Sequence, residues 1–428
     1  MRKLLIISTT FYPDPQVPAI RMTQWCRHLP KLGWRPHVLC RYYGYEATPE
    51  ELAANVHPDV TLEYLDKPEA ADGRGSAGGA FRNFVRTSIN PMLLSQPGIS
   101  SLFVPDPSIR FWRRRRQQIL QRVKAIQPDV ILTTSPPHSN HDIGLWLAAQ
   151  TGIPWVADFR DPYLLDNRFR PSGLGLLRWH AHERFKEAVY RRAWLITHAI
   201  PNQARWTRRH LPFARERLLT LTNAFPLEML EGLEAPRPTA NARKTVLVTG
   251  TIPEPEQLRL AQAVAQLAAE GQDVQLTLLG RRPGHEAELG RTLGERLVLP
   301  GYVSHAESVR AVMQADVLVN FLDAFRSQSR LLSTKLFEYL ASGNPVVCLN
   351  PSRVDRLLLW RMSGVKVVSG PSQEQLVSAL REALAGKLRR SPGDVENFRR
   401  EFNWPHRAGQ LVAALNQLVA FPPQNVPP

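Results

Sequence analysis

The chain has 428 residues, which is long enough for two or three domains and excludes a single small module. With 43% hydrophobic and 21% charged residues, its composition is that of a globular protein with a large core and excludes a disordered or fibrous chain. The 54 Lys and Arg residues against 38 Asp and Glu residues give a net charge of +16, which favours acidic partners: nucleic acid, an anionic membrane surface or phosphorylated small molecules.

The cysteines and the apolar runs indicate where the protein works. Only Cys26, Cys40 and Cys348 occur, far apart, so neither a disulfide framework nor a zinc cluster is expected and a reducing cytoplasm fits best. The apolar run at residues 4–7 is too short for a signal peptide and has no cleavage site after it. No segment reaches the roughly 18 uncharged apolar residues of a spanning helix, so we expect a cytoplasmic protein whose only membrane contact is peripheral, at the inner face.

The first half of the chain alternates strand and helix patterns. Residues 3–8 predict a buried strand, and Ile20, Trp25, Cys26 and Leu29 predict the apolar side of a helix that ends at Gly33. Further strands are predicted at residues 36–40, 129–134 and 154–157, with helices before and after the second of these. Such alternation is typical of a parallel sheet covered by helices.

The same pattern starts again in the second half, which predicts a second parallel-sheet domain. Strands are predicted at residues 245–250, 274–279, 297–300 and 316–320, and helices at residues 258–269 and 305–313. The Pro-rich stretch at residues 234–241 has no apolar face and is the predicted linker. Residues 67–80 predict a surface loop, and residues 81–103 predict an apolar, basic surface that contacts substrate or membrane.

Four sequences follow the predicted strands. They are residues 11–15 (FYPDP), 134–141 (TSPPHSNH), 158–162 (DFRDP) and 333–346 (STKLFEYLASGNPV). Together they resemble glycosyltransferase family 4, and within it the bacterial branch that builds surface polysaccharides such as lipopolysaccharide or exopolysaccharide. The resemblance covers nearly the whole chain in the same order.

The resemblance implies a GT-B fold, in which two Rossmann-like parallel-sheet domains face a cleft. It implies an acceptor-binding domain at residues 1–236 and a nucleotide-sugar-binding domain at residues 237–401. A C-terminal helix at residues 402–420 is expected to cross back to the first domain.

Glu338 is the main candidate for donor binding. A carboxylate near the start of a helix at such a cleft can accept hydrogen bonds from both ribose hydroxyls, while the helix N-terminus favours phosphate. The alternative is an acidic residue that only complements the helix dipole. The other residues expected at the donor are Ser333, Thr334, Lys335, Leu336, Arg330, Arg281, Arg282, Gly250 and Thr251.

Two positions depart from the family pattern. Arg330 stands where many members have a Glu that contacts the donor sugar, and residues 251–256 lack the usual Arg and Lys that hold the diphosphate. Either Asp323 or a backbone amide at residues 326–329 takes over the sugar contact, or the donor carries an acidic group that prefers Arg. Arginines, Lys335 and helix amides would then neutralise the leaving group, so neither metal nor cofactor is expected and the substrate is a UDP- or GDP-linked sugar.

The first domain supplies candidates of its own at the ends of its predicted strands. For His138 and His141 the choice is between donating to sugar or phosphate and a capping or loop role. For Asp158, Arg160 and Asp161 it is between positioning an acceptor hydroxyl and a structural salt-bridge cluster. The resemblance implies that Arg21, Pro13 and Asp14 contact the acceptor or a phosphate.

The arginines at residues 113–116 resemble a nucleic-acid patch at first sight. Four successive residues spread around a helix axis, and no nucleic-acid-binding fold signature accompanies them. A solvated or lipid-headgroup-facing surface is therefore favoured, and nucleic acid is not expected as a partner.

The sequence thus predicts a retaining, metal-independent glycosyltransferase that moves a hexose-type sugar from a nucleoside diphosphate to a glycan or polyprenyl-diphosphate-linked acceptor. Two alternatives stay open. A nucleotide-sugar epimerase shares this architecture, and a non-catalytic nucleotide-sugar-binding relative would explain Arg330 and the missing phosphate-binding pair.

Overall fold

The computed structural model describes residues 1–14, 17–67, 103–163, 174–227, 230, 243–250, 254–280, 284–321, 333–359, 362–370 and 372–421. The chain forms two compact units: Met1–Thr222 with Arg407–Pro428, and Asn223–His406. The predicted domain boundary at residues 236–237, the linker at 234–241 and nearly all of residues 67–103 lie outside the described residues.

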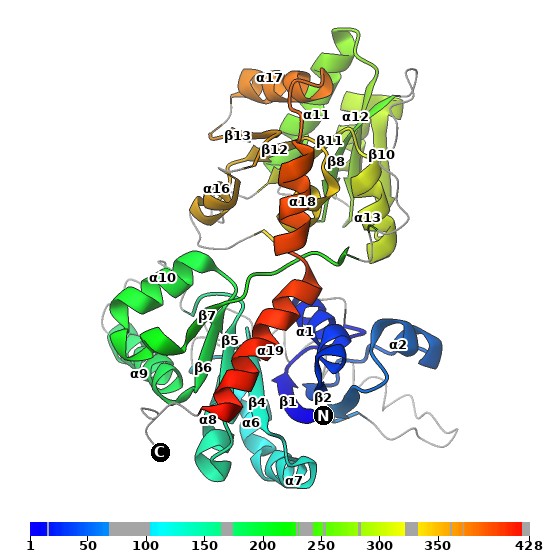
Figure 1. The fold of residues 1–428 in the computed structure, drawn as a ribbon. Coiled ribbons are helices and arrows are strands. Elements are labelled where there is room, and N and C mark those ends of the chain that lie inside the picture. The colour runs from blue at the N-terminus through cyan, green and yellow to red at the C-terminus, as the bar shows by residue number, and fades with distance from the viewer. Residues whose placement is uncertain are drawn as a thin grey trace. The chain divides into compact units, whose positions relative to one another are not determined.

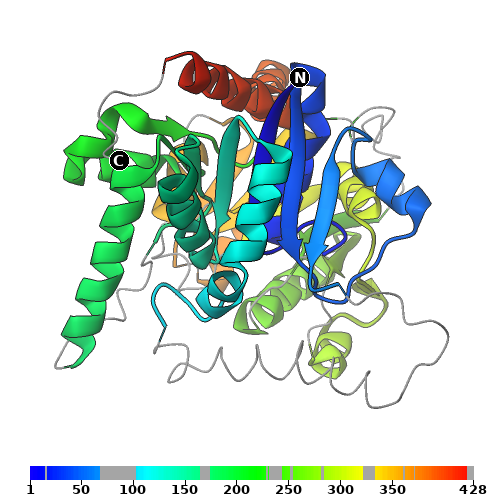
Figure 2. The ribbon, with the colours of Figure 1, turned by 90° about the horizontal axis from the view of Figure 1, so that it is seen from below.

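The first unit is built on a seven-stranded, entirely parallel sheet (Figures 1 and 2). Its strand order is β3-β2-β1-β4-β5-β6-β7, with the first strand inside the sheet between β2 and β4, as in Rossmann-like folds. The strands are β1 (Arg2–Ser8), β2 (Trp34–Arg41), β3 (Thr61–Leu65), β4 (Val130–Ser135), β5 (Trp155–Phe159), β6 (Leu195–His198) and β7 (Leu218–Thr220).

Helices flank this sheet and bury its apolar faces. Gly144 of α8 lets that helix approach the sheet closely, because a Cβ there would lie 2.7 Å from Thr133 Cγ2. The helices are α1 (Val17–His28), α2 (Pro49–Asn55), α6 (Ile109–Arg114), α7 (Arg116–Ile126), α8 (Ser139–Thr151), α9 (Leu174–Arg192), α10 (Pro201–His210) and α19 (Trp404–Ala420), with 3-10 turns η1 (Pro30–Leu32) and η3 (Pro212–Arg217).

One detail of α1 differs from the prediction. Trp25, Cys26 and Leu29 are completely buried, but Ile20 is 40% exposed. Ile20 and Trp25 are five residues apart, which places them about 140° apart around a helix. The buried position beside Trp25 is taken by Arg21, whose guanidinium lies over the indole ring at 4.2 Å from its centroid.

The last helix, α19, belongs to the first unit from Arg407 onward. Its Asn416 side chain accepts hydrogen bonds from Arg2 Nη1 (2.9 Å) and Trp34 Nε1 (3.1 Å), at the amino ends of β1 and β2. The chain therefore returns to the unit in which it began.

The second unit has a six-stranded parallel sheet in the order β10-β9-β8-β11-β12-β13. The strands are β8 (Lys244–Thr249), β9 (Val274–Leu279), β10 (Leu297–Gly301), β11 (Val317–Phe321), β12 (Val346–Leu349) and β13 (Val365–Val368). The helices are α11 (Glu254–Ala269), α12 (Glu286–Leu293), α13 (His305–Gln314), α15 (Lys335–Ser342), α16 (Arg353–Leu359), α17 (Gln373–Leu384) and α18 (Pro392–Glu401), with the 3-10 turn η5 (Gly294–Arg296).

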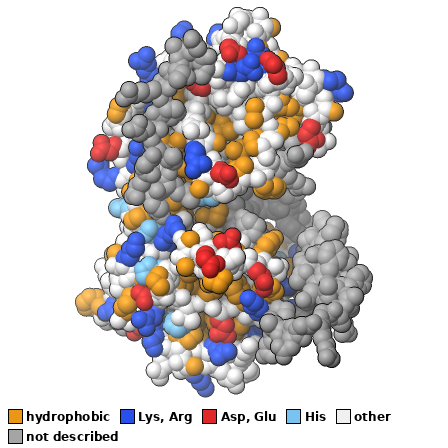
Figure 3. Space-filling model, turned by 90° about the vertical axis from the view of Figure 1, so that its right-hand side faces the viewer, with side chains coloured by type: hydrophobic (Ala, Val, Ile, Leu, Met, Phe, Trp, Pro, Cys, Tyr) orange, Lys and Arg blue, Asp and Glu red, His pale blue; other side chains and the backbone are white. Residues whose placement is uncertain are grey.

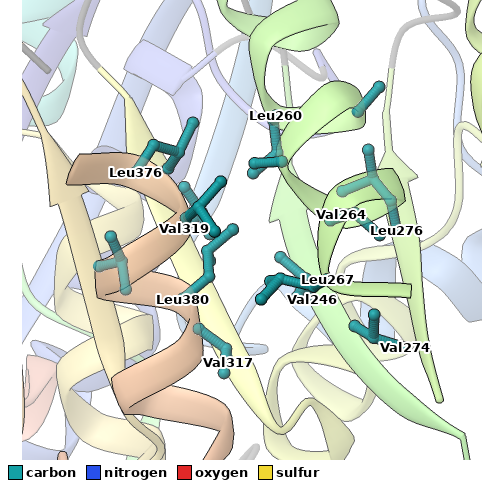
Figure 4. Close-up of a cluster of buried hydrophobic side chains, with 14 of the residues drawn as sticks. Val246, Leu260, Val264, Leu267, Val274, Leu276, Val317, Val319, Leu376 and Leu380 are labelled. Atoms are coloured by element: carbon teal, nitrogen blue, oxygen red, sulfur yellow. The ribbon is translucent and has the colours of Figure 1, made fainter. Parts of the chain in front are cut away.

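The core of this unit lies between two helices and three strands. Leucines of α11 and α17 point toward β8, β9 and β11 and are completely or almost completely buried (Figure 4). The β-branched residues of the strands fill the space between them, as expected for strands buried on both faces. The prediction of two parallel-sheet α/β domains is confirmed.

The predicted basic run at residues 113–116 is largely paired. Arg113 and Arg116 contact the two carboxylate oxygens of Asp142 at 2.9 and 2.7 Å, and Arg115 pairs with Asp66. Arg114 alone of the four has no ion pair within the described part of the chain. The face in Figure 3 likewise shows acidic and basic side chains interspersed.

Among the helices of the described residues, none combines the length and the apolar character that crossing a bilayer requires.

Candidate functional site

The carboxyl ends of the parallel strands in the second unit meet at one edge of the sheet, where open α/β sheets bind ligands. β8 ends at this edge and is followed by Gly250, whose φ of 79° is in the left-handed region. A Cβ at Gly250 would lie 2.5 Å from Lys335 Nζ, the movable end of a long side chain, so the left-handed backbone is what favours glycine at this strand end. Two predicted donor residues, Gly250 and Lys335, are therefore neighbours.

Helix α15 is attached to the end of β8 by polar contacts. Lys335 Nζ donates a hydrogen bond to the Thr249 carbonyl, and the Thr249 amide donates to Tyr339 Oη at 2.9 Å. Tyr339 is completely buried, which raises the pKa of its hydroxyl to about 12. These contacts fix where the N-terminus of α15 lies relative to the sheet edge.

Glu338 lies in the first turn of α15, on the side that is not packed into the core. Its side chain is 22% exposed, and its Oε1 is 2.7 Å from Nε2 of His305, the first residue of α13. Burial alone would lower the pKa of His305, but the hydrogen bond and charge of Glu338 outweigh it and raise that pKa. One carboxylate oxygen is thus held by an imidazole, and the carboxylate keeps further acceptor capacity for a ligand hydroxyl.

The residues at the start of α15 present backbone rather than side chains. Thr334 is the N-cap residue, and its side chain makes no capping hydrogen bond. The Leu336 side chain is completely buried, so the group that this residue can offer a ligand is its backbone amide. Amides in the first turn of a helix, together with the helix dipole, favour an anion such as phosphate.

Ser333, just before this helix, belongs to a network that sequence reasoning missed. Its amide donates to Asp355 Oδ1 (3.1 Å) and its hydroxyl to Asn320 Oδ1 (3.2 Å). Asp355 also accepts from the Ser352 amide (3.3 Å), and burial raises its pKa to about 6. Asn320 is 2% exposed, and within the described residues the Cys348 thiol, a weak acceptor, is the side chain near its amide, so this buried donor at the sheet edge has no oxygen partner there.

These missed residues differ in how visible they are in the sequence. Asp355 stands three residues after Ser352, the spacing of a capping box, and Asn320 is a polar residue at the end of an apolar strand. His305 carries no such signal. Of the predicted donor residues, Thr251, Arg281, Arg282 and Arg330 lie outside the described residues.

In the first unit, Arg21 and Asp158 form a buried ion pair. Arg21 Nε and Nη2 donate to the two oxygens of Asp158 at 3.2 and 3.0 Å, and the side chains are 2% and 0% exposed. Thr134 and Thr197 donate to the same carboxylate at 2.8 and 2.6 Å, and Arg21 Nη2 also donates to the Leu221 carbonyl at 2.8 Å. This arrangement corresponds to the structural salt-bridge alternative for Asp158 and leaves neither charge exposed.

His141 lies next to this network and is completely buried. Its Nδ1 is 2.8 Å from Thr133 Oγ1, which accepts a hydrogen bond from Trp155 Nε1 at 2.9 Å. The indole can only donate, so the threonine hydroxyl hydrogen remains available to Nδ1, and His141 Nε2 has no partner within the described residues. Burial, with a smaller effect of His198, lowers the pKa of His141 to about 3, so its ring is neutral at pH 7.

His138, Arg160 and Asp161 lie where β4 and β5 end. His138 is the N-cap residue of α8 but makes no side-chain cap, and its ring packs edge-on against Tyr163 with centroids 4.5 Å apart. Arg160 Nη2 donates to Asp161 at 3.0 Å, while Arg160 Nη1 and His138 Nδ1 are buried and have no hydrogen-bond partner among the residues that the structure describes. Burial, reinforced by nearby positive groups including Arg160, holds the pKa of His138 well below its usual range.

Pro13 and Asp14 follow β1 at the same edge. The Tyr12-Pro13 peptide is cis, and the Asp14 amide donates to the Phe11 carbonyl at 2.9 Å. Asp14 is 7% exposed, and its charge contributes to the raised pKa of the nearby Tyr64 hydroxyl. Within the described part of the chain, no group of three or more His, Cys, Asp or Glu side chains is placed to hold a metal ion.

Comparisons with known proteins agree with this architecture. No curated protein sequence matches the chain, but residues 243–386 match the family model of glycosyl transferases group 1. Sucrose-phosphate synthase from Thermosynechococcus elongatus is similar in structure, with a TM-score of 0.67, 15% identity and coverage of 98% of this chain and 100% of that one.

Two further structures were solved with nucleotide ligands. Anabaena HepE in complex with UDP and glucose has a TM-score of 0.63 and 14% identity, covering 98% of this chain and 100% of that one. UDP-GlcNAc 2-epimerase from Neisseria meningitidis, bound to UDP-GlcNAc, has a TM-score of 0.58 and 12% identity, covering 97% and 100%. The predicted fold and enzyme domain are thus confirmed: residues 243–386 form a glycosyl transferases group 1 domain in a chain with the GT-B fold.

Proposed function

We propose that the chain is a retaining glycosyltransferase of family 4 that takes a hexose-type sugar from a UDP- or GDP-linked donor. The observation that carries this proposal is the arrangement of polar groups at the carboxyl ends of the strands in the group 1 domain. There, Glu338 is partly exposed beside the N-terminus of α15, and the buried Asn320 amide has no oxygen partner among the described residues.

The chemistry follows from the charge that develops on the departing diphosphate. Fixed donors aimed at that charge stabilise the transition state, and the first turn of α15 with Lys335 supplies such donors. Glu338 binds the ribose hydroxyls and so positions the diphosphate at the helix. The leaving phosphate accepts the proton of the acceptor hydroxyl, so the reaction needs neither a metal ion, a cofactor nor a separate base.

The acceptor in this proposal is a glycan or a polyprenyl-diphosphate-linked sugar at the inner face of the cell membrane, during synthesis of a surface polysaccharide. The support is the resemblance of residues 134–141 and 158–162 to the bacterial branch of the family. At the edge where these residues lie, His138 and Arg160 each have a buried nitrogen atom with no partner in the described part of the chain.

Donor binding tests the proposal directly. The melting temperature of the protein is measured with UDP, GDP, ADP and their common sugars, because a ligand that binds only the native state raises it. Glu338→Ala is expected to weaken the selected donor by about 2 kcal/mol, or roughly 30-fold, since hydrogen bonds to a charged group are lost. An unchanged dissociation constant would remove Glu338 from the site.

Glu374→Ala is the matched control. Glu374 is an exposed acidic residue in the first turn of α17, so it complements a helix dipole as Glu338 does but lies in another helix. If both variants weaken donor binding equally, the loss is not specific to Glu338 and the ribose assignment fails.

The two alternatives differ in what they do without an acceptor. The epimerase from Neisseria meningitidis has a similar fold, so epimerisation stays one of the alternatives. Release of free epimerised sugar in the absence of acceptor would favour it. Nucleotide-sugar binding with no turnover across a panel of glycan and lipid-linked acceptors would favour a binding protein. Transfer with retained anomeric configuration, read by NMR of the product, is the result expected here.

A further inference from the structure

The positive charge of the chain lies almost entirely in one unit. Met1–Thr222 and Arg407–Pro428 contain 32 Lys and Arg against 18 Asp and Glu, whereas Asn223–His406 contains 22 against 20. The net charges are therefore +14 and +2. Residues 174–217, which include α9, α10 and η3, hold ten basic and three acidic residues.

Most of the arginines on this segment are not neutralised. Both acidic residues of α9 are already occupied, Glu183 by Lys186 and Glu187 by Arg191. Five arginines are exposed and have neither an ion pair nor a side-chain hydrogen bond in the described part of the chain: Arg184, Arg205, Arg208, Arg209 and Arg215. They contrast with the run at residues 113–116, where three of four arginines are paired.

The three elements form one continuous surface at the β7 side of the first unit (Figures 1 and 2). Lys186 of α9 lies 5.3 Å from the ring centroid of Trp206 in α10. Arg191 of α9 lies 4.2 Å from that of Phe213 in η3. We call this surface, formed by α9, α10 and η3, the α9–α10 surface.

The α9–α10 surface also exposes large apolar side chains. Leu177 is 70% exposed, Leu176 44% and Phe213 36%. Leu177, Arg184 and Arg191 are seven residues apart, so they lie on one face of α9, apolar at its start and basic toward its end. A neighbouring apolar and basic face of this kind is typical of helices that bind at the interface of an anionic bilayer.

We propose that the α9–α10 surface binds the surface of an anionic lipid bilayer. The free arginines contact lipid phosphates, and Leu176, Leu177 and Phe213 insert at the headgroup boundary. Nucleic acid would satisfy the arginines but would leave exposed aliphatic side chains in water, so the leucines favour lipid. The inference deepens the proposed function, on which it rests for its biological role, because a polyprenyl-linked acceptor lies in such a membrane.

The test is cosedimentation of the full chain with vesicles of phosphatidylglycerol and phosphatidylcholine, compared with pure phosphatidylcholine. Binding is expected to require the anionic lipid and to fall steeply at 0.5 M salt. R205E/R208E/R209E is expected to weaken binding by at least about 100-fold, since each basic residue near an anionic surface contributes about fivefold. Leu177→Ser is expected to weaken it less and without changing the salt dependence.

R291E/R310E/K387E makes the same change in net charge on exposed residues of the second unit and is expected to bind vesicles as the wild type does. R205Q/R208Q/R209Q removes the three charges without reversing them and serves as a second variant in case the charge-reversal variant does not fold. A melting curve followed by fluorescence shows whether each variant is folded. Equal loss in both triple variants, binding to neutral vesicles, or displacement from vesicles by duplex DNA of equal phosphate concentration would overturn the proposal.

The same proteins are also melted with the selected nucleotide. R205E/R208E/R209E is expected to lose vesicle binding, while the nucleotide still raises its melting temperature as it does for the wild type. If no nucleotide shifts any variant, the proposed function fails, while the vesicle data still decide the surface.

Discussion

The two units share a parallel-sheet architecture but differ in how far the carboxylates at the carboxyl edge are exposed. In the first unit Arg21 and Asp158 are buried and satisfied by each other, two threonines and backbone carbonyls. In the second unit Glu338 and His305 are 22% and 37% exposed, and the Asn320 amide has no oxygen partner among the described residues. A fully satisfied network fixes a structure, whereas unsatisfied or half-exposed groups are available to a ligand.

The two units also differ in net charge. The first unit carries a net charge of +14 and the second +2, although both have similar numbers of charged residues. Charge that is not cancelled locally attracts anionic partners at long range. This difference is in line with the proposed nucleotide site in the second unit and with the proposed bilayer-binding surface of the first.

The largest effect is expected from Asp158→Asn. The substitution leaves Arg21 buried without a counter-ion, which typically costs about 3–5 kcal/mol of unfolding free energy. Tryptophan fluorescence during urea unfolding measures it selectively, because eight of the ten tryptophans are in the first unit.

Asp161→Asn is the control for this change. Its carboxylate is 27% exposed and contacts Arg160 at 3.0 Å, so the loss is expected to stay below about 1 kcal/mol. A variant Asp158→Asn that unfolds like the wild type but no longer transfers sugar would reverse the comparison and make Asp158 a catalytic group.

Acid should destabilise the first unit and not the second. Burial lowers the pKa of both His141 and His198 to about 3, so below their usual pKa of 6.5 the unfolded chain binds protons that the folded unit does not. Stability is then lost as the pH falls, by about 1.4 kcal/mol for each histidine at pH 5.5 and about 3 kcal/mol together. His138 and His182, whose pKa values are also lowered by burial, act in the same direction, and Asp106, whose pKa burial raises, acts against them.

In the second unit, the unfolding free energy changes with pH in the opposite direction. Burial raises the pKa of Asp355 to about 6 from 3.8, so the folded unit takes up its proton first and gains about 0.8 kcal/mol between pH 7.5 and 5.5. Unfolding followed by tryptophan fluorescence should therefore shift to lower urea at pH 5.5, and His198→Gln should flatten that shift. A fluorescence transition that does not move with pH would show that these histidines are protonated in the folded unit.

The features that could be predicted from the sequence are those that depend on residues close together in the chain. Strand and helix periodicity located both sheets, and residues 333–346 located the helix that carries Glu338 and begins beside Gly250. The sequence could not show that Arg21 pairs with Asp158, because the two are 137 residues apart and only the folded sheet brings them together. The same holds for charge: the arginines at residues 113–116 are more prominent in the sequence than those of α10, but two distant aspartates pair with three of them.

The smallest effect is expected from His305→Ala. The imidazole holds Glu338 Oε1 at 2.7 Å and so restricts the carboxylate before the donor binds, but the His305 side chain is 37% exposed and the pair is screened by water. The donor dissociation constant should rise by less than about fivefold, with His406→Ala, an exposed histidine of the same unit, as the control. Because Glu338 raises the pKa of His305, the difference from wild type should be larger at pH 6, where the ring is protonated, than at pH 8.5. Tighter donor binding in the variant would mean that His305 competes with the ribose for Glu338, and the second unit would then hold its ligand-binding carboxylate in a closed pair, as the first unit holds Asp158.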